Sequence, residues 1–514
     1  MRYKILSVFA AAAALAACSD LTSINNNPNG PENVDPPSLL ASSLDEIASG
    51  VNGVNSLNIR GGGLWVQYYA EIQYRDEDKY ILRSGSSGGW GFYNGAAENA
   101  QRMIAKGQSA VRPNWSAVGR ILKSYVFSVM TDAMGDLPYS QALKSDTVLQ
   151  PVYDTQQSIH NALFTDLAQA TSEIDVAAAA PPGDPTGFGF PNGDILFGGA
   201  MSQWRKFANS LRLRLAIHLS KVDSVKAASE AAAAVAAGVF TSNADNATLE
   251  YLATAPNQNP IYQDVHVGNR DDYGLSKTYV DSLKSWNDPR LPIFAQLNRD
   301  TDTVAITYRG LPNGLNDGEG PKLFYISRIG ALWRETPNAP MHLLTYSEVL
   351  FLEAEAAERG WIAGNAAQLY MDAITASMEQ YGIPASDIAT YEAVGKVAYD
   401  SAADSTGTPL GATRAGHLQQ IAYQKWVSMF MQGMEAWTEV RRTGVPVLVP
   451  GCRAVMRHIP ERLPYDDNES VLNETNLTAA VTRQGFSASN DISKPLWFTG
   501  RTTSVDHPPP AVCP

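Results

Sequence analysis

Aromatic side chains gather in the segment 61–93, where glycines interrupt them. The rings are those of Trp65, Tyr68, Tyr69, Tyr74, Tyr80, Trp90, Phe92 and Tyr93. Flat rings can stack on the C–H faces of sugars and other amphipathic ligands, while neighbouring polar groups hydrogen-bond to hydroxyls. We predict ligand contacts first from Trp90 and Tyr93, which lie close to several glycines, and then from Trp65, Tyr68 and Arg75. Because Trp and Tyr also anchor loops on a helical core, many of the other rings are expected to be structural.

The remaining polar side chains form no recognisable catalytic pattern. The chain has no GxxxxGKS or GxxxxGKT phosphate loop and no HExxH pair, and no two histidines are four residues apart. Glu348, Glu353, Glu355 and Glu358 lie at varied positions around one predicted helix, and Glu355 with Arg359 has the spacing of an i, i+4 ion pair. We therefore expect a solvated or structural role for these acids, no catalytic residues and no cofactor.

A stretch near residue 300 has some features of a calcium loop. Asn298, Asp300 and Asp302 alternate as oxygen ligands do, which keeps calcium open as an alternative. However, Thr303 occupies the position that needs glycine, and Arg309 the position that needs a bidentate glutamate. We interpret the stretch as an ordinary polar loop and predict no metal site.

Cys18 ends a short apolar segment at the N-terminus. Arg2 and Lys4 precede a run from Ile5 to Ala17 that only Ser7 interrupts. This pattern is typical of a secretory signal peptide, too short to span a bilayer as a permanent helix. Because the small residues before the cysteine resemble a bacterial lipobox, we predict cleavage before Cys18 and acylation, for example by palmitate, of its thiol. The alternative is an ordinary signal peptide that happens to end near a cysteine. Ser19 favours the outer membrane over the inner membrane.

Charge and composition restrict the partners of the mature chain. Removal of residues 1–17 leaves 497 residues (514 − 17) with a net charge of −15, since the −13 of the full chain loses two positive charges. This acidity disfavours nucleic acid and anionic lipid headgroups as partners. Residues 18–37 are rich in Asn, Pro and Ser and indicate a flexible tether, followed by the folded body 38–514. Cys452 and Cys513 could pair in an oxidising compartment, or remain two separate thiols.

The body is predicted to be mainly α-helical. Apolar residues recur three and four positions apart in the segments 114–134, 155–176, 201–221, 223–238, 342–360, 363–382 and 411–443. Long stretches rich in Gly, Pro and Tyr separate them at 50–95, 177–200, 241–340 and 444–514. Such long loops usually carry function. Within 348–374, small alanines flank a glycine turn, which favours a tetratricopeptide-like helical hairpin over an unrelated one.

Several segments together resemble the SusD/RagB family of nutrient-binding outer-membrane lipoproteins, in particular its SusD-like subgroup. The matching segments are 132–142, 151–156, 194–199, 204–214, 345–361, 424–426, 433–437, 441–444 and 459–465. They follow the order of the family and cover nearly the whole mature chain. We interpret these motifs as scaffold. Arg441 and Arg442, for example, can cap helix carbonyls or pair with a buried acid such as Glu435.

The resemblance implies a mainly α fold, in which tetratricopeptide-like hairpins carry long loops and a smaller ligand-facing subdomain. It implies a nutrient-binding lipoprotein on the cell surface, anchored in the outer membrane through Cys18. The implied ligand is an oligosaccharide, most naturally a glycan, or a peptide. The implied partner is a SusC-like, TonB-dependent transporter, over which the protein would act as a lid without catalysing a reaction. Two alternatives remain, namely a surface-anchored glycan hydrolase and a helical-repeat adaptor of the envelope.

Overall fold

The protein is mainly α-helical, as the sequence predicts. The computed structural model describes residues 34–54, 56–82, 89–144, 147–176, 193–299, 305–321, 325–401, 412–507 and 513. The predicted signal peptide, Cys18 and residues 19–33 of the predicted tether lie outside these residues, as do Asp300 and Asp302. Among the described helices, none is long and apolar enough to cross a membrane.

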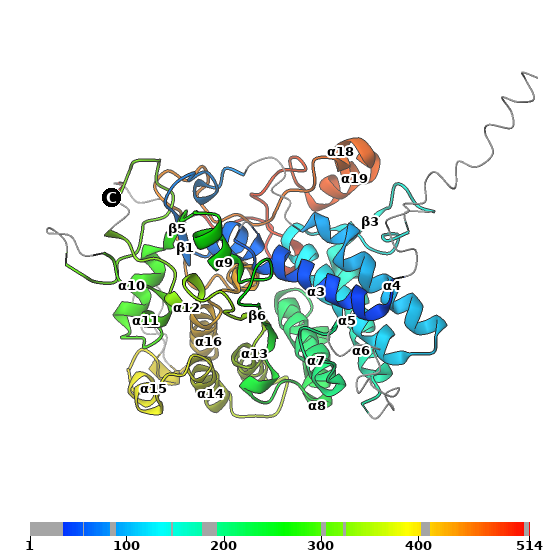
Figure 1. Cartoon of the computed structure of the whole chain (residues 1–514), viewed down its shortest axis with the longest axis horizontal. Helices are drawn as coiled ribbons and strands as arrows, with labels where there is room; N and C mark the ends of the chain where they lie inside the picture. The colour runs from blue at the N-terminus through cyan, green and yellow to red at the C-terminus, as the bar shows by residue number, and fades with distance from the viewer. Residues whose placement is uncertain are drawn as a thin grey trace, which may run out of the picture.

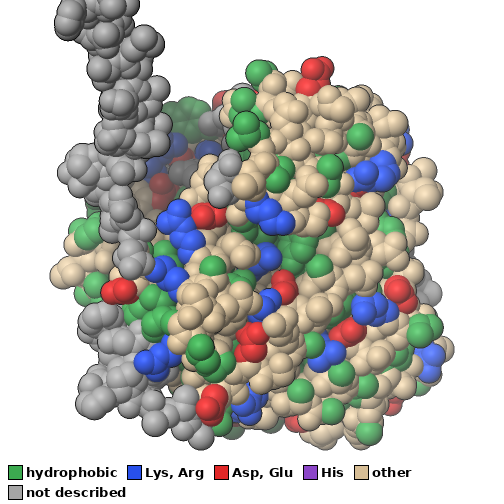
Figure 2. All heavy atoms as spheres, turned by 90° about the vertical axis from the view of Figure 1, so that its right-hand side faces the viewer, with side chains coloured by type: hydrophobic (Ala, Val, Ile, Leu, Met, Phe, Trp, Pro, Cys, Tyr) green, Lys and Arg blue, Asp and Glu red, His purple; other side chains and the backbone are tan. Residues whose placement is uncertain are grey.

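The first half of the chain builds a row of packed helices. These are α3 (Pro36–Asn52), α4 (Ala96–Ser109), α5 (Pro113–Met134), α6 (Gln156–Glu173), α7 (Met201–His218) and α8 (Ser224–Ala237). From α4 to α8 each helix packs against the next, from the right of Figure 1 towards its centre. The face at the right of Figure 1 is turned to the viewer in Figure 2, where positive and negative side chains are interspersed. That face therefore offers no broad surface of a single charge.

The second half continues the row with α13 (Tyr346–Glu358), α14 (Ala366–Glu379), α15 (Ala385–Glu392) and α16 (Arg414–Ser428). Helix α17 (Gly433–Thr443) packs against α16 and α5, and α19 (Glu474–Gln484) lies apart from the row, at the top of Figure 1 beside α18 (Glu469–Leu472). The predicted hairpin is confirmed as α13 and α14. Its close packing depends on Ala354 and Ala373, which are fully buried. The Ser347 hydroxyl also donates to the Ala373 carbonyl at 2.7 Å. Short helices complete the fold, namely α9 (Pro260–Tyr262), α10 (Lys277–Ser285), α11 (Leu291–Phe294), α12 (Ala331–Arg334) and α18 (Glu469–Leu472).

The structure differs from the predicted helices in two ways. The single helix predicted over 411–443 is two helices, α16 and α17, because the backbone at Gly433 meets the turn of π-helix 57–63. A Cβ at Gly433 would lie 1.9 Å from the Asn58 carbonyl oxygen, so only glycine permits this approach. In addition, α10 and α19 occur within stretches predicted to be irregular. Both are short, and tertiary packing stabilises them.

Three short antiparallel sheets join segments that are distant in the sequence. β1 (Tyr69–Glu71) pairs with β5 (Tyr273–Leu275), with Tyr69 opposite Leu275 and Glu71 opposite Tyr273. β2 (Leu137–Pro138) pairs with β3 (Tyr153–Asp154), and β4 (Ala247–Leu249) with β6 (Met341–Leu344). The β1–β5 pair holds the loop 64–82 against the long segment 268–330.

A small separate core lies beside the β1–β5 pair. It consists of Ala70, Ile72, Leu311, Leu315 and Ile326, with Cys452 packed against it. The structure links Cys452 to Cys513 by a disulfide, with Cα atoms 5.5 Å apart.

Candidate functional site

The structure places Trp65 and Tyr68 in the core, where neither can contact a ligand. Both side chains are fully buried. The Trp65 ring packs edge-on against Trp437 with centroids 4.7 Å apart, and the Tyr68 hydroxyl donates to the Trp426 carbonyl. The prediction of ligand contact is wrong for these two residues, because their rings fill the space between the loop 64–82 and helices α16 and α17.

Arg75 is also occupied by the fold. It is buried, its Nε donates to the Ile72 carbonyl at 3.0 Å, and its Nη1 donates to the carbonyls of Asn316 and Glu319 at 2.7 and 2.8 Å. Arg75 therefore ties the loop 64–82 to the segment 305–321. A guanidinium with three carbonyl partners is poorly placed to bind a ligand as well, so this prediction is also wrong.

Trp90 and Tyr93 lie together in an aromatic cluster that remains half-exposed. Their ring centroids are 5.1 Å apart, and Trp90 also stacks on Tyr153 at 6.4 Å and meets Tyr465 at 6.3 Å. The Tyr93 hydroxyl donates to the Pro138 carbonyl at 2.6 Å. Tyr93 is thus anchored by the fold, whereas Trp90 keeps part of its indole at the surface. Ligand binding by this pair stays a prediction.

A more exposed ring lies just after β1. Tyr74 is 54% exposed, and the Arg270 guanidinium lies 5.4 Å from its ring centroid. Tyr74 has a φ of +58°, in the left-handed region that bulky residues rarely adopt. Its neighbours impose this backbone, because Arg75 is held by three carbonyls and the Gln73 amide donates to Asp272. Backbone strain of this kind concentrates at binding sites.

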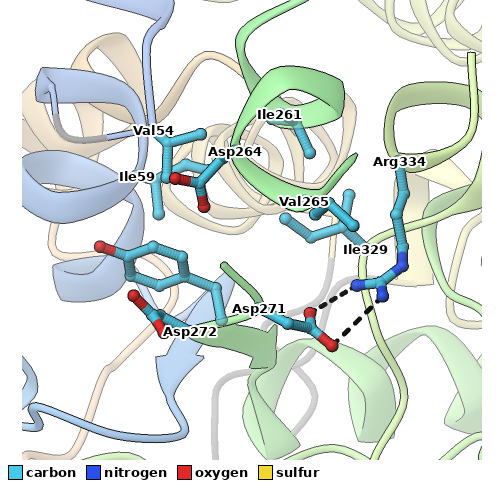
Figure 3. A pocket seen from close by; sticks show the side chains of 10 residues that line it. Val54, Ile59, Ile261, Asp264, Val265, Asp271, Asp272, Ile329 and Arg334 are labelled. Atoms are coloured by element: carbon cyan, nitrogen blue, oxygen red, sulfur yellow. Dashed lines mark hydrogen bonds and ion pairs between the residues drawn. The ribbon is translucent and has the colours of Figure 1, made fainter. Parts of the chain in front are cut away.

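A narrow recess lies next to Arg270, and Figure 3 shows its walls. Apolar side chains form one part of the lining, namely Val54, Ile59, Ile261, Val265 and Ile329. Acidic side chains and Arg334 form the rest, and Arg334 reaches across to Asp271. The cavity volume is about 20 Å³, enough for one water-sized group such as a hydroxyl.

Of the three acids that line the recess, Asp264 and Asp271 have opposite electrostatic environments. Burial and the nearby Asp272 carboxylate raise the pKa of Asp264 above its usual value. Burial alone would raise the pKa of Asp271 as well, but hydrogen bonds from Arg334 and the charge of Arg328 lower it. Arg328 Nε donates to Asp271 Oδ2 at 3.0 Å and Arg334 donates to both oxygens. Asp271 is therefore engaged within the protein, whereas the Asp264 carboxylate points into the recess in Figure 3.

Two further rings flank Asp264 along the chain, at the π-helix Gln263–Val267. Tyr262 and His266 stack with centroids 4.6 Å apart, and His266 Nε2 lies 2.9 Å from Glu335. We name the surface formed by Tyr74, Tyr262, Asp264, His266 and Arg270 the Tyr74–Asp264 face. Exposed rings beside carboxylate and guanidinium groups can stack on a sugar and hydrogen-bond to its hydroxyls.

The sequence did not reveal this face, because its two halves are distant along the chain. Tyr74 belongs to the aromatic segment 61–93, but the other four residues come from the segment 259–270. The antiparallel pairing of β1 with β5 brings the two segments together. The one available signal was the density of polar and aromatic residues in 262–273, which does not indicate what lies opposite.

One group of side chains within the described ranges is compact enough to hold a metal ion. His218, Glu435 and Glu439 offer ligand atoms within 4.8 Å of one another. However, Lys425 Nζ lies 3.1 Å and Arg442 Nη2 2.6 Å from Glu439 Oε2. These two cations already supply the positive charge that a metal would bring, so we assign the cluster to the buried ion network of the core.

His218 is the centre of that network. Its Nδ1 lies 2.9 Å from Asp132 and its Nε2 2.8 Å from Glu435. Burial alone would lower the pKa of His218, but the carboxylates of Glu435 and Asp132 outweigh burial and raise it to about 10. The imidazolium thus links α5, α7 and α17 in the core. Elsewhere in the network, Arg442 pairs with Glu355 and Glu439 and not with Glu435, while Arg441 donates to the Trp437 carbonyl.

The predicted ion pair between Glu355 and Arg359 is present, with Arg359 Nη2 2.7 Å from Glu355 Oε1. Glu348 and Glu355 are buried, so their role is structural and not solvated. Glu348 accepts two hydrogen bonds from Arg214, at 2.7 Å each. This ties α13 to α7.

Comparison with known proteins identifies the relatives of this chain. A family model named SusD-like, with the description "starch-binding associating with outer membrane", matches residues 28–466. Among proteins with curated descriptions, none matches the chain significantly.

Solved structures share the fold over nearly the whole chain. A chitin-binding protein has 27% sequence identity and a TM-score of 0.75, and the match covers 90% of this chain and 100% of that one. A SusD homologue from Bacteroides fragilis has 25% identity and a TM-score of 0.76, over 92% and 100% of the two chains. A chitin-binding SusD homologue from Flavobacterium johnsoniae is 24% identical, with a TM-score of 0.72 over 90% and 98%, and shows similarity of fold alone.

Proposed function

This chain belongs to the SusD-like family, and from that membership we propose that it is a non-catalytic glycan-binding protein of the bacterial outer membrane. The observation that carries the proposal is the match of the family model to residues 28–466, because the model describes starch-binding proteins that associate with the outer membrane. The chitin-binding relative, 27% identical over 90% of this chain, also favours a glycan as the ligand.

We propose that the glycan binds at the Tyr74–Asp264 face. Tyr74 offers an exposed ring, and the Arg270 guanidinium beside it can hydrogen-bond to hydroxyls. The Asp264 carboxylate borders a recess that admits one hydroxyl-sized group. The shallow shape suits a chain of sugars that lies along the surface, with a single substituent inserted.

The same face supports binding without catalysis. Glycoside hydrolysis needs two carboxyl groups that are free to act on the scissile bond. Both oxygens of Asp271 accept hydrogen bonds from arginines. The third acid of the recess, Asp272, accepts from Gln73 and Arg270, so both possible partner acids of Asp264 are already engaged within the protein. A glycan held here would be bound and released unchanged.

The predicted anchor and partner complete the proposal. An acylated Cys18 would hold the protein at the outer membrane, since each buried methylene contributes about 0.8 kcal/mol. The Asn- and Pro-rich segment 18–37 would then let the body move above a SusC-like, TonB-dependent barrel. Gentle extraction of the lipoprotein from native outer membranes should recover this barrel in stoichiometric amounts. Recovery of the protein alone would contradict the partner and leave the glycan proposal standing.

The binding proposal is tested by titrating the purified protein with chitin and starch oligosaccharides and measuring heat of binding. We expect Tyr74→Ala to weaken binding about fivefold to thirtyfold, because a stacked ring and its cation–π partner contribute about 1–2 kcal/mol. Trp90→Ala is the matched variant, as it removes a half-exposed ring from the other aromatic cluster. Loss of affinity in Trp90→Ala alone would move the site to that cluster, and turnover of the oligosaccharides would reject the non-catalytic role.

A further inference from the structure

A cavity of about 370 Å³ lies at the C-terminal end of α17, and its lining is unusually basic. Its charged members are Lys221, Arg441, Arg442, Arg501 and Glu461, and two histidines, His458 and His507, also line it. Four cations thus surround one carboxylate in a protein whose net charge is −13. The volume falls within the roughly 300–1,000 Å³ of small-molecule sites.

Two of the four cations are neutralised by acids of the protein. Arg442 Nη2 lies 2.7 Å from Glu355 Oε2 and 2.6 Å from Glu439 Oε2. Arg501 donates from Nη1 and Nη2 to the two oxygens of Glu461, at 2.7 and 2.8 Å. Both oxygens of Glu461, the one carboxylate of the lining, therefore accept hydrogen bonds from Arg501.

Arg441 lacks a carboxylate partner among the described residues. Its three nitrogens donate to the carbonyls of Trp437 and Glu461 and to the Thr438 hydroxyl, and its guanidinium lies 3.5 Å from the centroid of the Trp437 ring. Burial lowers the pKa of Arg441, with a smaller contribution from the charge of Arg501, and the carboxylates of Glu461 and Asp132 oppose this only in part. A buried cation in this position gains free energy when an anion enters beside it.

Lys221 lies at the exposed rim of the cavity, at the end of the 3-10 helix Leu219–Lys221. Burial of its stem and the charges of Arg442 and Arg359 lower the pKa of its ammonium, so its surroundings are electropositive. His458 adds a ring nitrogen that can hydrogen-bond to a ligand. Its Nδ1 lies 2.9 Å from the Ile459 carbonyl, to which it donates, and this leaves Nε2 for a ligand.

The end of α17 accounts for only part of this positive charge. The C-terminus of a helix carries about half a negative charge, which favours one basic residue in the last turn. Arg441 satisfies that requirement through its bond to the Trp437 carbonyl. Lys221 belongs to the 3-10 helix Leu219–Lys221 and not to α17, so the negative end of the α17 dipole does not explain its position at the rim of the cavity.

We propose that this cavity binds a small anion that carries a phosphate or carboxylate group. The anion enters past Lys221 and pairs with the Lys221 ammonium, with His458 Nε2 as an additional hydrogen-bond partner. The Arg441 guanidinium, whose three nitrogens already donate within the protein, contributes its positive charge and not a hydrogen bond. The volume admits a molecule the size of an acidic sugar as well as inorganic phosphate. This inference does not depend on the proposed glycan face, because none of the five residues of that face lines the cavity.

The test is calorimetric titration of the full-length protein at constant ionic strength, with sodium chloride as the balancing salt. The probes are inorganic phosphate, galacturonate and glucose. We expect phosphate, galacturonate or both to bind wild type, and Lys221→Glu to weaken that binding at least tenfold. Lys284→Glu is the matched control, since it makes the same charge change at an exposed lysine of α10. It should bind as wild type does.

Each outcome decides the proposal. Binding of phosphate alone assigns the site to phosphate groups, and binding of galacturonate alone assigns it to carboxylates. The proposal is overturned if neither anion binds, if Lys221→Glu binds as tightly as wild type, or if glucose binds as well as galacturonate in a Lys221-dependent manner. If Lys221→Glu loses its native circular dichroism, Lys221→Gln takes its place, with an expected weakening of about threefold to tenfold. Loss of glycan binding in Tyr74→Ala leaves these results unchanged.

Discussion

The buried ion pair between Arg214 and Glu348 predicts a large loss of stability in Arg214→Met. Arg214 Nε lies 2.7 Å from Glu348 Oε1 and its Nη2 lies 2.7 Å from Oε2, so the pair is bidentate. Nη2 also donates to the Leu343 carbonyl at 2.9 Å. The two side chains are 4% and 0% exposed, so Glu348 would have neither its main partner nor water after the substitution.

The burial of the pair sets the magnitude. Removing one partner of a buried ion pair costs about 3–5 kcal/mol, because the remaining charge is left uncompensated. We expect a decrease of this size in the free energy of unfolding of Arg214→Met. The pair of Arg102 and Glu98 is the matched control, since it is also an arginine–glutamate pair at 3.0 Å but is 54% and 31% exposed. Arg102→Met should cost at most about 0.5 kcal/mol.

The assay is urea unfolding followed by circular dichroism, with a double-mutant cycle. Arg214→Met combined with Glu348→Leu removes both charges, and such replacements of buried pairs are often close to neutral. The double variant should therefore recover at least about 2 kcal/mol relative to the sum of the single changes. The reasoning is refuted if Arg214→Met is no less stable than Arg102→Met, or if the two single losses add in the double variant.

Two further changes test the packing and the electrostatics of the core. The pKa of His218 is raised to about 10 in the folded state, from about 6.5 when unfolded, so its stabilising contribution is complete below pH 6.5 and is lost as the pH rises through 10. Between pH 6 and pH 10 the free energy of unfolding, measured with urea, should fall more in wild type than in His218→Asn. Equal decreases in the two proteins would contradict the raised pKa of His218. Gly433→Ala would place a Cβ 1.9 Å from the Asn58 carbonyl oxygen and 2.6 Å from the Gly63 nitrogen, and should lower the melting temperature at a cost of about 3 kcal/mol. Gly395→Ala, where nothing lies within 4 Å, should change stability by no more than about 0.5 kcal/mol, and similar losses in both would reject the packing argument.

The longer helices could be predicted because the spacing of their apolar residues is a local property of the sequence. It does not depend on which element of the fold each helix packs against. The segments 114–134, 155–176, 201–221 and 223–238 correspond to α5, α6, α7 and α8, with ends displaced by only a few residues. The helix at 411–443 was interrupted by a contact that no local pattern encodes, since the backbone of residues 58–63 arrives from a distant part of the chain.

The aromatic loop shows the limit of prediction for a binding site. Residue type identified the rings that could stack on a ligand, but it did not separate Trp65 and Tyr68 from Tyr74. Trp65 and Tyr68 are buried against α16 and α17, whereas Tyr74 is 54% exposed. Exposure is a property of the packed fold, and a stacking ring is useful to a ligand only where it is exposed.

The sequence by itself determined that this chain is a helical protein of the SusD-like family, with a predicted lipid anchor at Cys18. Helix periodicity, motif order and the N-terminal charge pattern are properties of the sequence, and they can be recognised without knowledge of the fold. Only the tertiary structure decided which rings are exposed, that β1 and β5 bring Tyr74 beside Arg270, and that basic residues from distant elements share one cavity. These features bring together residues that are far apart in the sequence, namely Tyr74 and Arg270, 196 positions apart, and Lys221 and Arg441, 220 positions apart, and no spacing along the chain specifies them.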